Sequence, residues 1–236
     1  MFMIFEKKYS FGKIVISDED TKDGNIRTLS VNGARESACY TEEGRHFELR
    51  FGYTLEFAQI MERADMNRRV LLIGGAGFSV PKYFVSHIHS GTMDVVELHG
   101  EMYDIAMQYF FLDELYRKYP RETEKRLRII IDDGNQYIKN CSKSYDVILD
   151  DAYSGRVADS GLLSEGTIGR IADILSPDGV YAINLITPAR GFGSMQASLT
   201  CSILKNHFRK VSMWQVDPGR KPTERQNCII MASGPK

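Results

Sequence analysis

The sequence predicts an α/β protein, in which a small N-terminal antiparallel β module precedes a doubly wound, mostly parallel seven-stranded sheet. From Val70 onward, short apolar segments alternate with helix-length segments. This alternation is typical of a parallel sheet with helices packed on both faces. The first apolar segment, Val70 to Ile73, has no polar residue, as expected for a strand that is buried on both faces.

The N-terminal part has a different pattern, which predicts a separate module. Residues 1–52 contain short β-rich segments separated by Asp, Gly and Asn. Asn32-Gly33 is the dipeptide most typical of a tight hairpin turn. We therefore expect a β-hairpin or small sheet in residues 1–52 and a Rossmann-like α/β domain in residues 53–236. The expected N-terminal strands are KIVISD, IRTLSVNG, SACYTEE and HFELRFG.

The elements of the second domain follow from hydrophobic periodicity and from glycine and proline signals. The expected strands are VLLIGG, DVVEL, LRIIID, DVILD, VYAINLI, VSMWQV and NCIIMAS. The expected helices are TLEFAQIMERADM, a stretch around 79–88, EMYDIAMQYFF, NQYIKNC, a stretch around 164–175 and SMQASLTCSILKNHF. No helix separates the last two strands, so we expect them to form an antiparallel pair, because parallel neighbours need a long crossover.

Composition limits the functional classes. The 236 residues have a formal net charge of −1, which gives no indication of a nucleic-acid surface or a polybasic membrane contact. No apolar run approaches the roughly 20 residues that a membrane-spanning helix needs. We therefore expect a cytoplasmic protein that binds neither nucleic acid nor membrane. His87 and His89 lie close together, but no carboxylate or cysteine accompanies them within a few residues, so no metal site is expected.

The stretch from Val70 to Glu97 has the features of a site for a nucleoside. It contains an apolar strand, the glycine turn Gly74 to Gly77, a helix-length segment and a second strand that ends in Glu97. Glycines at a strand end allow a tight turn and the close approach of a ligand. An acid about twenty residues further on can accept hydrogen bonds from two ribose hydroxyls.

The residue at position 80 argues against a dinucleotide. The dinucleotide fingerprint needs a small third residue so that the helix can pack closely on the strand, and Val80 stands at that position. A further acid at the end of the third strand gives no advantage in binding a pyrophosphate. A cationic sulfonium nucleoside fits an acidic rim better.

Acids follow the next two strands of the predicted sheet. The third strand ends at Asp132-Asp133-Gly134 and the fourth at Asp150-Asp151. Ligands of open α/β sheets bind beyond the carboxyl ends of the strands, where these acids and Glu97 meet. Each acid also has a structural explanation. The acids after the third strand could cap a helix, those after the fourth could belong to a turn, and Glu97 could be a solvated strand end.

Four sequence blocks at these strand ends resemble, in order and spacing, the core of the spermidine synthase (polyamine aminopropyltransferase) family. The blocks are VLLIGGAGFSVPKYF, DVVELHGEMYDIAMQYF, LRIIIDDGNQYIKN and YDVILDDAY. That family has the class I methyltransferase-like fold of proteins that use S-adenosylmethionine. The resemblance covers roughly residues 50–235, and the β-rich N-terminus is similar to the small N-terminal sheet domain of the family.

The resemblance implies a role for each strand-end residue. The cofactor-binding residues that it implies are Gly74, Gly75, Gly77, Glu97, Asp133 and Gly134. The glycines match the loop beside the cofactor's tail, Glu97 matches the acid that holds the ribose, and Asp133-Gly134 matches the pair at the adenine amino group.

The acceptor half of the site is expected at the end of the fourth strand. Asp150 matches the acid that holds or deprotonates the attacking amine, and it is the expected catalytic residue. Alkylamines have pKa values near 10.4, so a carboxylate must accept a proton before the amine attacks. Asp151, Tyr153 and Tyr53 are expected to bind the acceptor substrate.

Two blocks depart from the family pattern. The glycine loop of the family usually reads Gly-Gly-Gly-Asp-Gly, whereas residues 74–78 read GGAGF and lack the Asp. The strand-four signature is close to Asp-Ser-x-Asp-Pro, whereas residues 150–154 read DDAYS, so Tyr153 replaces the second acid and the proline is missing.

These observations predict a transferase that binds S-adenosylmethionine or decarboxylated S-adenosylmethionine as a co-substrate, without a metal. The expected reaction is aminopropyl transfer to a polyamine, a step of polyamine biosynthesis. One alternative is methyl transfer to an unknown small-molecule or protein acceptor, and another is a nucleoside-binding homologue without catalysis. The resemblance suggests a homodimer, for which the exposed edges of the N-terminal sheet are a natural place.

Overall fold

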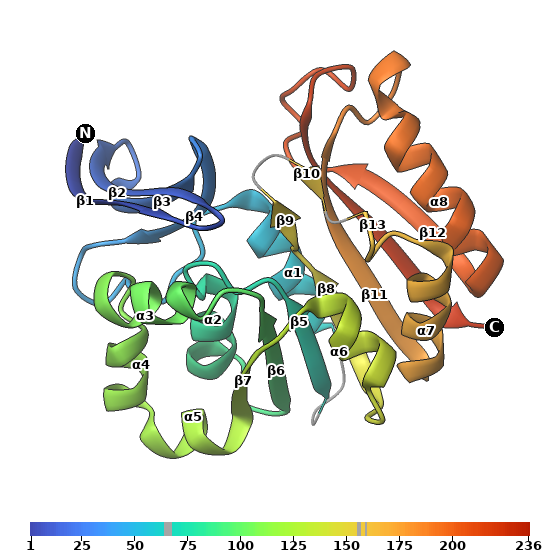
Figure 1. The fold of residues 1–236 in the computed structure, drawn as a ribbon, viewed down its shortest axis with the longest axis horizontal. Coiled ribbons are helices and arrows are strands. Elements are labelled where there is room, and N and C mark those ends of the chain that lie inside the picture. The colour runs from blue at the N-terminus through green and yellow to red at the C-terminus, as the bar shows by residue number, and fades with distance from the viewer. Residues whose placement is uncertain (64–67, 155–156, 159) are drawn as a thin grey trace.

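The computed structural model describes residues 1–63, 68–154, 157–158 and 160–236. Its first unit is an antiparallel four-stranded sheet in the order β1-β2-β3-β4, drawn in blue in Figure 1. The strands are β1 (Phe2–Tyr9), β2 (Gly12–Thr21), β3 (Gly24–Val31) and β4 (Ala34–Tyr40). Asn32 and Gly33 have φ values of 51° and 78°, as the predicted hairpin turn between β3 and β4 requires.

Two N-terminal expectations were wrong. Residues 2–9 form strand β1, which the sequence pattern did not indicate, and HFELRFG forms no strand. In that segment Phe47 and Leu49 are buried in the core that the N-terminal sheet shares with the second unit. The alternation of apolar residues in this segment suggested a strand, but these side chains are buried without strand pairing.

The second unit is a seven-stranded sheet in the order β12-β13-β11-β8-β5-β6-β7, which confirms the predicted fold class. Its strands are β5 (Arg69–Ile73), β6 (Thr92–Glu97), β7 (Leu127–Ile131), β8 (Tyr145–Asp150), β11 (Leu175–Thr187), β12 (Phe208–Gln215) and β13 (Gln226–Pro235). Strands β7, β6, β5, β8 and β11 are parallel, and β13 lies antiparallel between β11 and β12. Two short strands, β9 (Tyr153–Ser154) and β10 (Val157–Ala158), form a separate pair.

Helices cover both faces of this sheet. They are α1 (Gly52–Glu62), α2 (Ser79–His87), α3 (Gly100–Tyr109), α4 (Leu112–Lys118), α5 (Pro120–Arg126), α6 (Gly134–Asn140), α7 (Glu165–Ile174) and α8 (Met195–His207), with a short 3₁₀ turn at Phe192–Ser194. On β5, Val70 and Leu72 pack on the face covered by α1 to α4, whereas Leu71 and Ile73 pack on the face covered by α6 to α8. We call these the α1 face and the α7 face. The N-terminal sheet lies beyond the α1 face, near α2 and α3 (Figure 1).

The helix expected in TLEFAQIMERADM begins at Gly52 and is described to Glu62; residues 64–67 lie outside the described part. Helices α4 and α5 were not expected, and Pro120 begins α5 at a position where a missing N–H costs nothing. Ser176 to Gly179, which follow the helix expected around 164–175, lie within β11, where the register to β8 shifts between Leu175 and Val180. Among the described residues, no helix is long and apolar enough to span a bilayer.

Asp94 lies in the N-terminal half of β6 and connects this strand with β7 and β8. Its buried carboxylate accepts hydrogen bonds from Arg128 Nε (3.0 Å), from the Tyr145 hydroxyl (2.6 Å) and from Lys143 Nζ (2.9 Å). Burial raises the pKa of Asp94, but the bonds from Tyr145 and Lys143 and the charge of Arg128 outweigh it, so the pKa lies below its usual value. Its partners lie at or just before the N-terminal ends of β7 and β8, away from the strand ends that carry Glu97 and Asp151, so its role is structural.

We expect Asp94→Ala to lower the free energy of unfolding by about 3 kcal/mol, because it leaves a buried tyrosine hydroxyl and two cations without their acceptor. Since the folded pKa of Asp94 is depressed, its contribution is present above about pH 4 and is lost as the pH falls further. Urea unfolding at pH 7 and pH 3 measures both effects. Asp113→Ala removes an exposed ion pair with Arg117 and should change stability by less than about 0.5 kcal/mol. Equal losses in the two variants would contradict this assignment.

Candidate active site

The glycine turn packs directly against the end of strand four. Gly74 has a φ of +92°, and a Cβ there would lie 2.5 Å from the backbone oxygen of Asp151. A Cβ at Gly75 would lie 2.8 Å from the ring of Phe78. Only glycine therefore fits at either position, and the turn brings the end of β5 beside the end of β8.

Glu97 fixes the conformation of this turn. Its Oε2 accepts hydrogen bonds from the backbone N–H groups of Gly75 (2.8 Å) and Ala76 (3.1 Å), and its Oε1 accepts one from His99 (2.9 Å). Glu97 is 6% exposed, so it is not a solvated strand end. Its carboxylate also lines a cavity, where it can accept further hydrogen bonds.

This cavity, which we call the strand-end cavity, has a volume of about 150 Å³. Of the residues predicted to bind the cofactor, Gly74, Glu97, Asp133 and Gly134 line it. Asp133 also caps α6, because its Oδ1 accepts a hydrogen bond from the backbone N–H of Gln136 (2.9 Å), so the capping alternative holds together with the position in the cavity. A Cβ at Gly134 would lie 2.7 Å from Ile73 Cγ2, which explains the glycine. Asp132 is exposed and does not line it.

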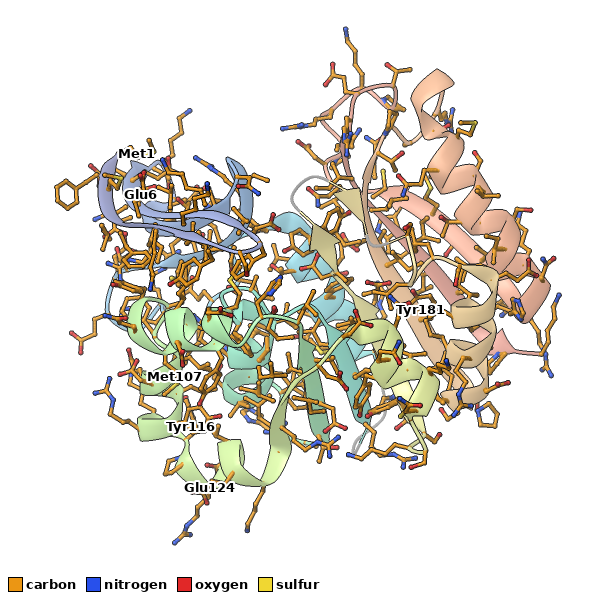
Figure 2. The ribbon with its side chains drawn as sticks, viewed as in Figure 1. Met1, Glu6, Met107, Tyr116, Glu124 and Tyr181 are labelled. Carbon is orange, nitrogen blue, oxygen red and sulfur yellow. The ribbon has the colours of Figure 1, made fainter. Side chains whose placement is uncertain are left out.

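The structure places Asp150, the predicted catalytic residue, and Asp151 on opposite sides of β8. Side chains alternate between the two faces of a strand. Asp150 points to the α7 face, where its Oδ2 accepts a hydrogen bond from the buried Tyr181 hydroxyl (2.8 Å) and its Oδ1 accepts one from the N–H of Ala152 (3.2 Å). Figure 2 shows Tyr181 in the interior on that side. Asp151 points the other way and lines the strand-end cavity, which Asp150 does not.

Asp151 is held by groups from two other elements. Asn184 on β11 donates from Nδ2 to Oδ1 of Asp151 (2.9 Å), and Tyr53 on α1 is also hydrogen-bonded to its carboxylate. Asn227 donates to Oδ1 of Asn184 (2.9 Å) and so fixes the orientation of that amide. Burial raises the pKa of Asp151 to about 7, against the opposing hydrogen bonds from Asn184 and Tyr53. Asp151 is therefore close to half-ionised at neutral pH, as a general base requires.

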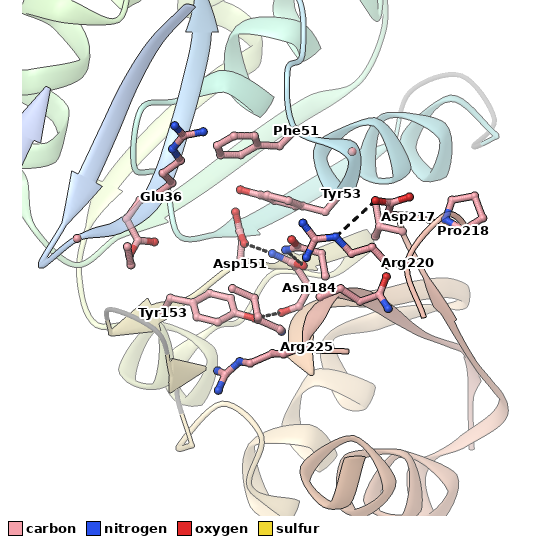
Figure 3. A pocket seen from close by; sticks show the side chains of 18 residues that line it. Glu36, Phe51, Tyr53, Asp151, Tyr153, Asn184, Asp217, Pro218, Arg220 and Arg225 are labelled. Carbon is pink, nitrogen blue, oxygen red and sulfur yellow. Dashed lines mark hydrogen bonds and ion pairs between the residues drawn. The ribbon is translucent and has the colours of Figure 1, made fainter. Parts of the chain in front are cut away.

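A second, larger cavity opens on the other side of Asp151. We call it the open cavity; its volume is about 780 Å³ (Figure 3). It is lined by all three residues that were predicted to bind the acceptor substrate, namely Asp151, Tyr153 and Tyr53. In Figure 3, Asp151 lies between the two tyrosines. The Tyr153 hydroxyl donates to the backbone oxygen of Asn184 (2.8 Å), so its position is fixed by β11.

A third space, the small cavity, lies beside the glycine turn and has a volume of about 20 Å³. Gly74, Gly75 and Tyr53 line it. Gly77, also predicted to bind the cofactor, lines none of these three cavities, because it packs against Ser37 on β4. Asp151 lines all three cavities and marks the place where they meet.

Sequence reasoning missed three residues of the site. Glu36 on β4 lines all three cavities, and Asn184 and Arg225 line the open cavity. A single Asn in the apolar strand VYAINLI was a usable signal for Asn184. The turn expected after the fourth strand reaches residues 155–156, which lie outside the described residues. In the part of the chain described, no group of three or more His, Cys, Asp or Glu side chains is arranged for a metal ion.

The fold and the arrangement of strand ends define a class I methyltransferase-like protein with a site beyond the carboxyl ends of its strands. Residues 51–190 match the family model of the spermine/spermidine synthase domain, and the chain therefore belongs to that family.

Relatives of known sequence fall into two groups. A polyamine aminopropyltransferase from Vibrio vulnificus is 24% identical over 194 residues, which are 80% of this chain and 60% of the relative. An eEF1A lysine and N-terminal methyltransferase homologue from Drosophila pseudoobscura pseudoobscura is 23% identical over 174 residues, 68% of this chain. The chain spans about a quarter of that methyltransferase's length (24%).

Three solved structures share the fold. A probable spermidine synthase from Corynebacterium glutamicum has a TM-score of 0.78 at 22% identity, covering 97% of this chain and 79% of the other. A spermidine synthase bound to the transition state analogue AdoDATO has a TM-score of 0.74 at 18% identity, covering 99% and 74%. Human methyltransferase-like protein 13 bound to SAH has a TM-score of 0.57 at 22% identity, covering 77% and 78%.

Proposed function

We propose that this protein is a transferase that moves an aminopropyl group from a sulfonium nucleoside to an amine acceptor. The observation that carries the proposal is the position of Asp151, a base with a pKa of about 7 at the junction of the strand-end and open cavities. The strand-end cavity has the groups that a nucleoside needs, with Glu97 for the ribose and Asp133 for the adenine amino group. The open cavity receives the acceptor.

The small cavity favours the decarboxylated form of the nucleoside. The donor's tail leaves the strand-end cavity past Gly74 and Ala76, which line both spaces. Glu36 and Asp151 line the small cavity, and none of the described residues around it is Lys or Arg. The N–H groups of Gly75 and Ala76 already donate to Glu97. A tail carboxylate would therefore lie near two acids without a neighbouring cation. A tail that carries only an ammonium brings no carboxylate near these acids.

The proposed chemistry uses Asp151 as the base. The acceptor amine must lose a proton, and the Asp151 carboxylate takes it while Tyr53 and Asn184 hold that carboxylate in place. The amine nitrogen then forms a bond to the carbon beside the sulfonium. The carbon–sulfur bond breaks, and its electron pair remains on sulfur as the neutral thioether of methylthioadenosine. Alignment of nitrogen, carbon and sulfur supplies most of the rate.

The proposal is tested by incubating the protein with the decarboxylated nucleoside and putrescine and measuring the release of methylthioadenosine. We expect release that depends on both substrates. The names of the AdoDATO-bound and SAH-bound structural neighbours support a sulfur nucleoside as the donor. Absence of release, together with retained binding of methylthioadenosine, would contradict the aminopropyl proposal.

Methyl transfer is the second candidate, favoured by the similarity to eEF1A lysine and N-terminal methyltransferase homologues. The open cavity is large enough for a lysine side chain or a peptide terminus as acceptor. Incubation with S-adenosylmethionine and a lysine-containing peptide would then yield S-adenosylhomocysteine and no methylthioadenosine. The identity of the nucleoside product separates the two reactions.

The pH dependence follows from Asp151. Because only the ionised carboxylate accepts a proton, kcat/KM for the acceptor should rise about tenfold per pH unit below pH 7 and level off above it. A profile between pH 5 and pH 9 at saturating donor measures this. A rate that is independent of pH between 5 and 7 would contradict the assignment of Asp151 as the base.

We also propose a homodimer that forms through the edge of the N-terminal sheet. Strand β1 is an edge strand, and its residues Phe2 and Met3 are 73% and 58% exposed. Light scattering coupled to size exclusion should give twice the chain mass. Phe2→Ser combined with Met3→Ser should yield the monomer, whereas Leu199→Ser, an exposed apolar change on α8, should not. A monomeric unmodified protein would contradict the proposal.

A further inference from the structure

Glu36 enters the site because strand β4 contains an irregularity. In the pairing of β3 with β4, Leu29 pairs with Ser37 and Ser30 pairs with Arg35, so the register shifts at Glu36. Such bulges redirect a side chain and are common beside functional sites. Arg35 forms an ion pair with Glu19, whereas Glu36 lines all three cavities. Figure 3 shows Glu36 on the same side of the open cavity as Asp151.

The Glu36 carboxylate lacks a partner on one oxygen. Its Oε1 is shielded from solvent and has no hydrogen-bond partner among the described residues. Burial, together with the charges of Asp151 and Glu97, raises the pKa of Glu36 to about 8. A buried carboxyl with an unsatisfied oxygen is costly unless a ligand supplies the missing partner. The ligand that satisfies this oxygen must be a cation or a hydrogen-bond donor, because a carboxylate oxygen is an acceptor.

The same strand explains why the glycine turn carries no acid of its own. The glycine loops that this chain resembles have an Asp at the position of Gly77. Here a Cβ at Gly77 would lie 2.6 Å from Ser37 Oγ and 2.9 Å from Ser37 Cβ. Strand β4 occupies the space that a side chain at position 77 would need, and it places Glu36, the neighbour of Ser37, beside the turn.

From these observations we propose that Glu36 binds the primary ammonium of the donor's aminopropyl tail and thereby selects the decarboxylated nucleoside over intact S-adenosylmethionine. This inference rests on the proposed function and adds the residue that determines donor specificity. The tail is the natural ligand because Glu36, Gly74 and Ala76 all line both the strand-end and the small cavity. Glu36 therefore stands on the path from the nucleoside to Asp151. Once the ammonium favours the ionised form of Glu36, an α-carboxylate on the same tail would lie beside it as a like charge.

The test is isothermal titration of the full chain with three ligands that share one nucleoside. Methylthioadenosine has no charged tail, the decarboxylated nucleoside has an ammonium, and S-adenosylmethionine has an ammonium and a carboxylate. Glu36→Gln keeps the shape of the side chain and removes its charge. It should weaken the decarboxylated nucleoside about ten- to one-hundredfold and change methylthioadenosine less than about twofold. Glu6→Gln, on the outer strand of the same sheet (Figure 2), should change neither affinity.

Proton release distinguishes a direct contact from a structural effect. Glu36 faces Asp151 and Glu97, and its charge acts on the Tyr53 hydroxyl, so these groups form its titrating surroundings. At pH 7 the free carboxyl holds a proton, because its pKa lies near 8. The incoming ammonium favours the ionised form, so binding should release more protons to the buffer in the unmodified protein than in Glu36→Gln. Titrations in phosphate and Tris buffers measure the difference.

Several results would overturn the inference while the proposed function stands. One is unchanged affinity of Glu36→Gln for the decarboxylated nucleoside. Another is an equal loss of affinity for methylthioadenosine, which would show a structural role. A third is equal proton release in the two proteins. By contrast, failure of the unmodified protein to bind any of the three nucleosides would overturn the proposed function itself, together with the inference that rests on it.

Discussion

Asp151→Asn is expected to lower the turnover of decarboxylated nucleoside and putrescine by roughly a thousandfold, within the range of a general-base contribution. The amide cannot accept the proton of the acceptor amine. It can still occupy the same space between Tyr53 and Asn184. Affinity for methylthioadenosine should therefore change by less than about threefold. Release of methylthioadenosine under saturating conditions measures the first effect, and isothermal titration measures the second.

Asp150→Asn is the matched control, one residue away with the same chemical change. Asp150 binds Tyr181 on the α7 face and touches neither proposed substrate. We expect Asp150→Asn to keep turnover within about tenfold and to reduce stability by roughly 1–3 kcal/mol, because the hydrogen bond to a buried hydroxyl is weakened. If Asp150→Asn abolished turnover and Asp151→Asn did not, the assignment made from strand alternation would be wrong.

Glu97→Ala is expected to weaken methylthioadenosine binding by roughly a hundredfold or more. The change removes the acceptor for the ribose hydroxyls and leaves three backbone N–H groups, of Gly75, Ala76 and His99, without a partner. The glycine turn loses the group that fixes it, so the cavity is no longer preorganised. The same loss should lower the free energy of unfolding by roughly 2–4 kcal/mol. Isothermal titration and urea unfolding measure the two effects.

Two controls separate the roles of Glu97. Asp132→Ala removes an exposed acid just after the neighbouring strand β7; among the described residues, this acid accepts a hydrogen bond only from the N–H of Asp133. It should leave nucleoside binding within about threefold. Glu97→Gln keeps one carbonyl oxygen for the turn, so its stability should lie between those of Glu97→Ala and the unmodified protein. Normal methylthioadenosine affinity in Glu97→Ala would show that Glu97 stabilises the glycine turn but does not bind the nucleoside.

The cofactor half of the site could be predicted from the sequence because its residues are local. Gly74, Gly75, Glu97 and Asp133 each lie at a strand's last residue or within two residues after it, and the carboxyl ends of parallel strands meet at one edge. Their spacing alone therefore placed them together. Gly77 was the exception, because the reason for its glycine is the packing of a strand forty residues earlier in the chain.

The acceptor half could be predicted only in part. Tyr53, Asp151 and Tyr153 were expected there, and all line the open cavity. The choice between Asp150 and Asp151 depends on which face of β8 meets α1 and which meets α7. The alternation of side chains along a strand indicates that Asp150 and Asp151 point in opposite directions. It does not indicate which face of the sheet carries the site.

What the sequence determined by itself was the alternation of strands and helices in the second unit, the two-faced burial of the parallel sheet and the acids at its carboxyl edge. These follow from periodicity and from residues adjacent in the chain. Only the tertiary structure decided that β4 crosses the glycine turn, that Glu36 enters the site through a register shift, and that Asn184 and Tyr53 hold Asp151. The contacts of β4 with the glycine turn and of Asn184 and Tyr53 with Asp151 join segments more than thirty residues apart. They arise from the packing of whole elements, which no local pattern encodes.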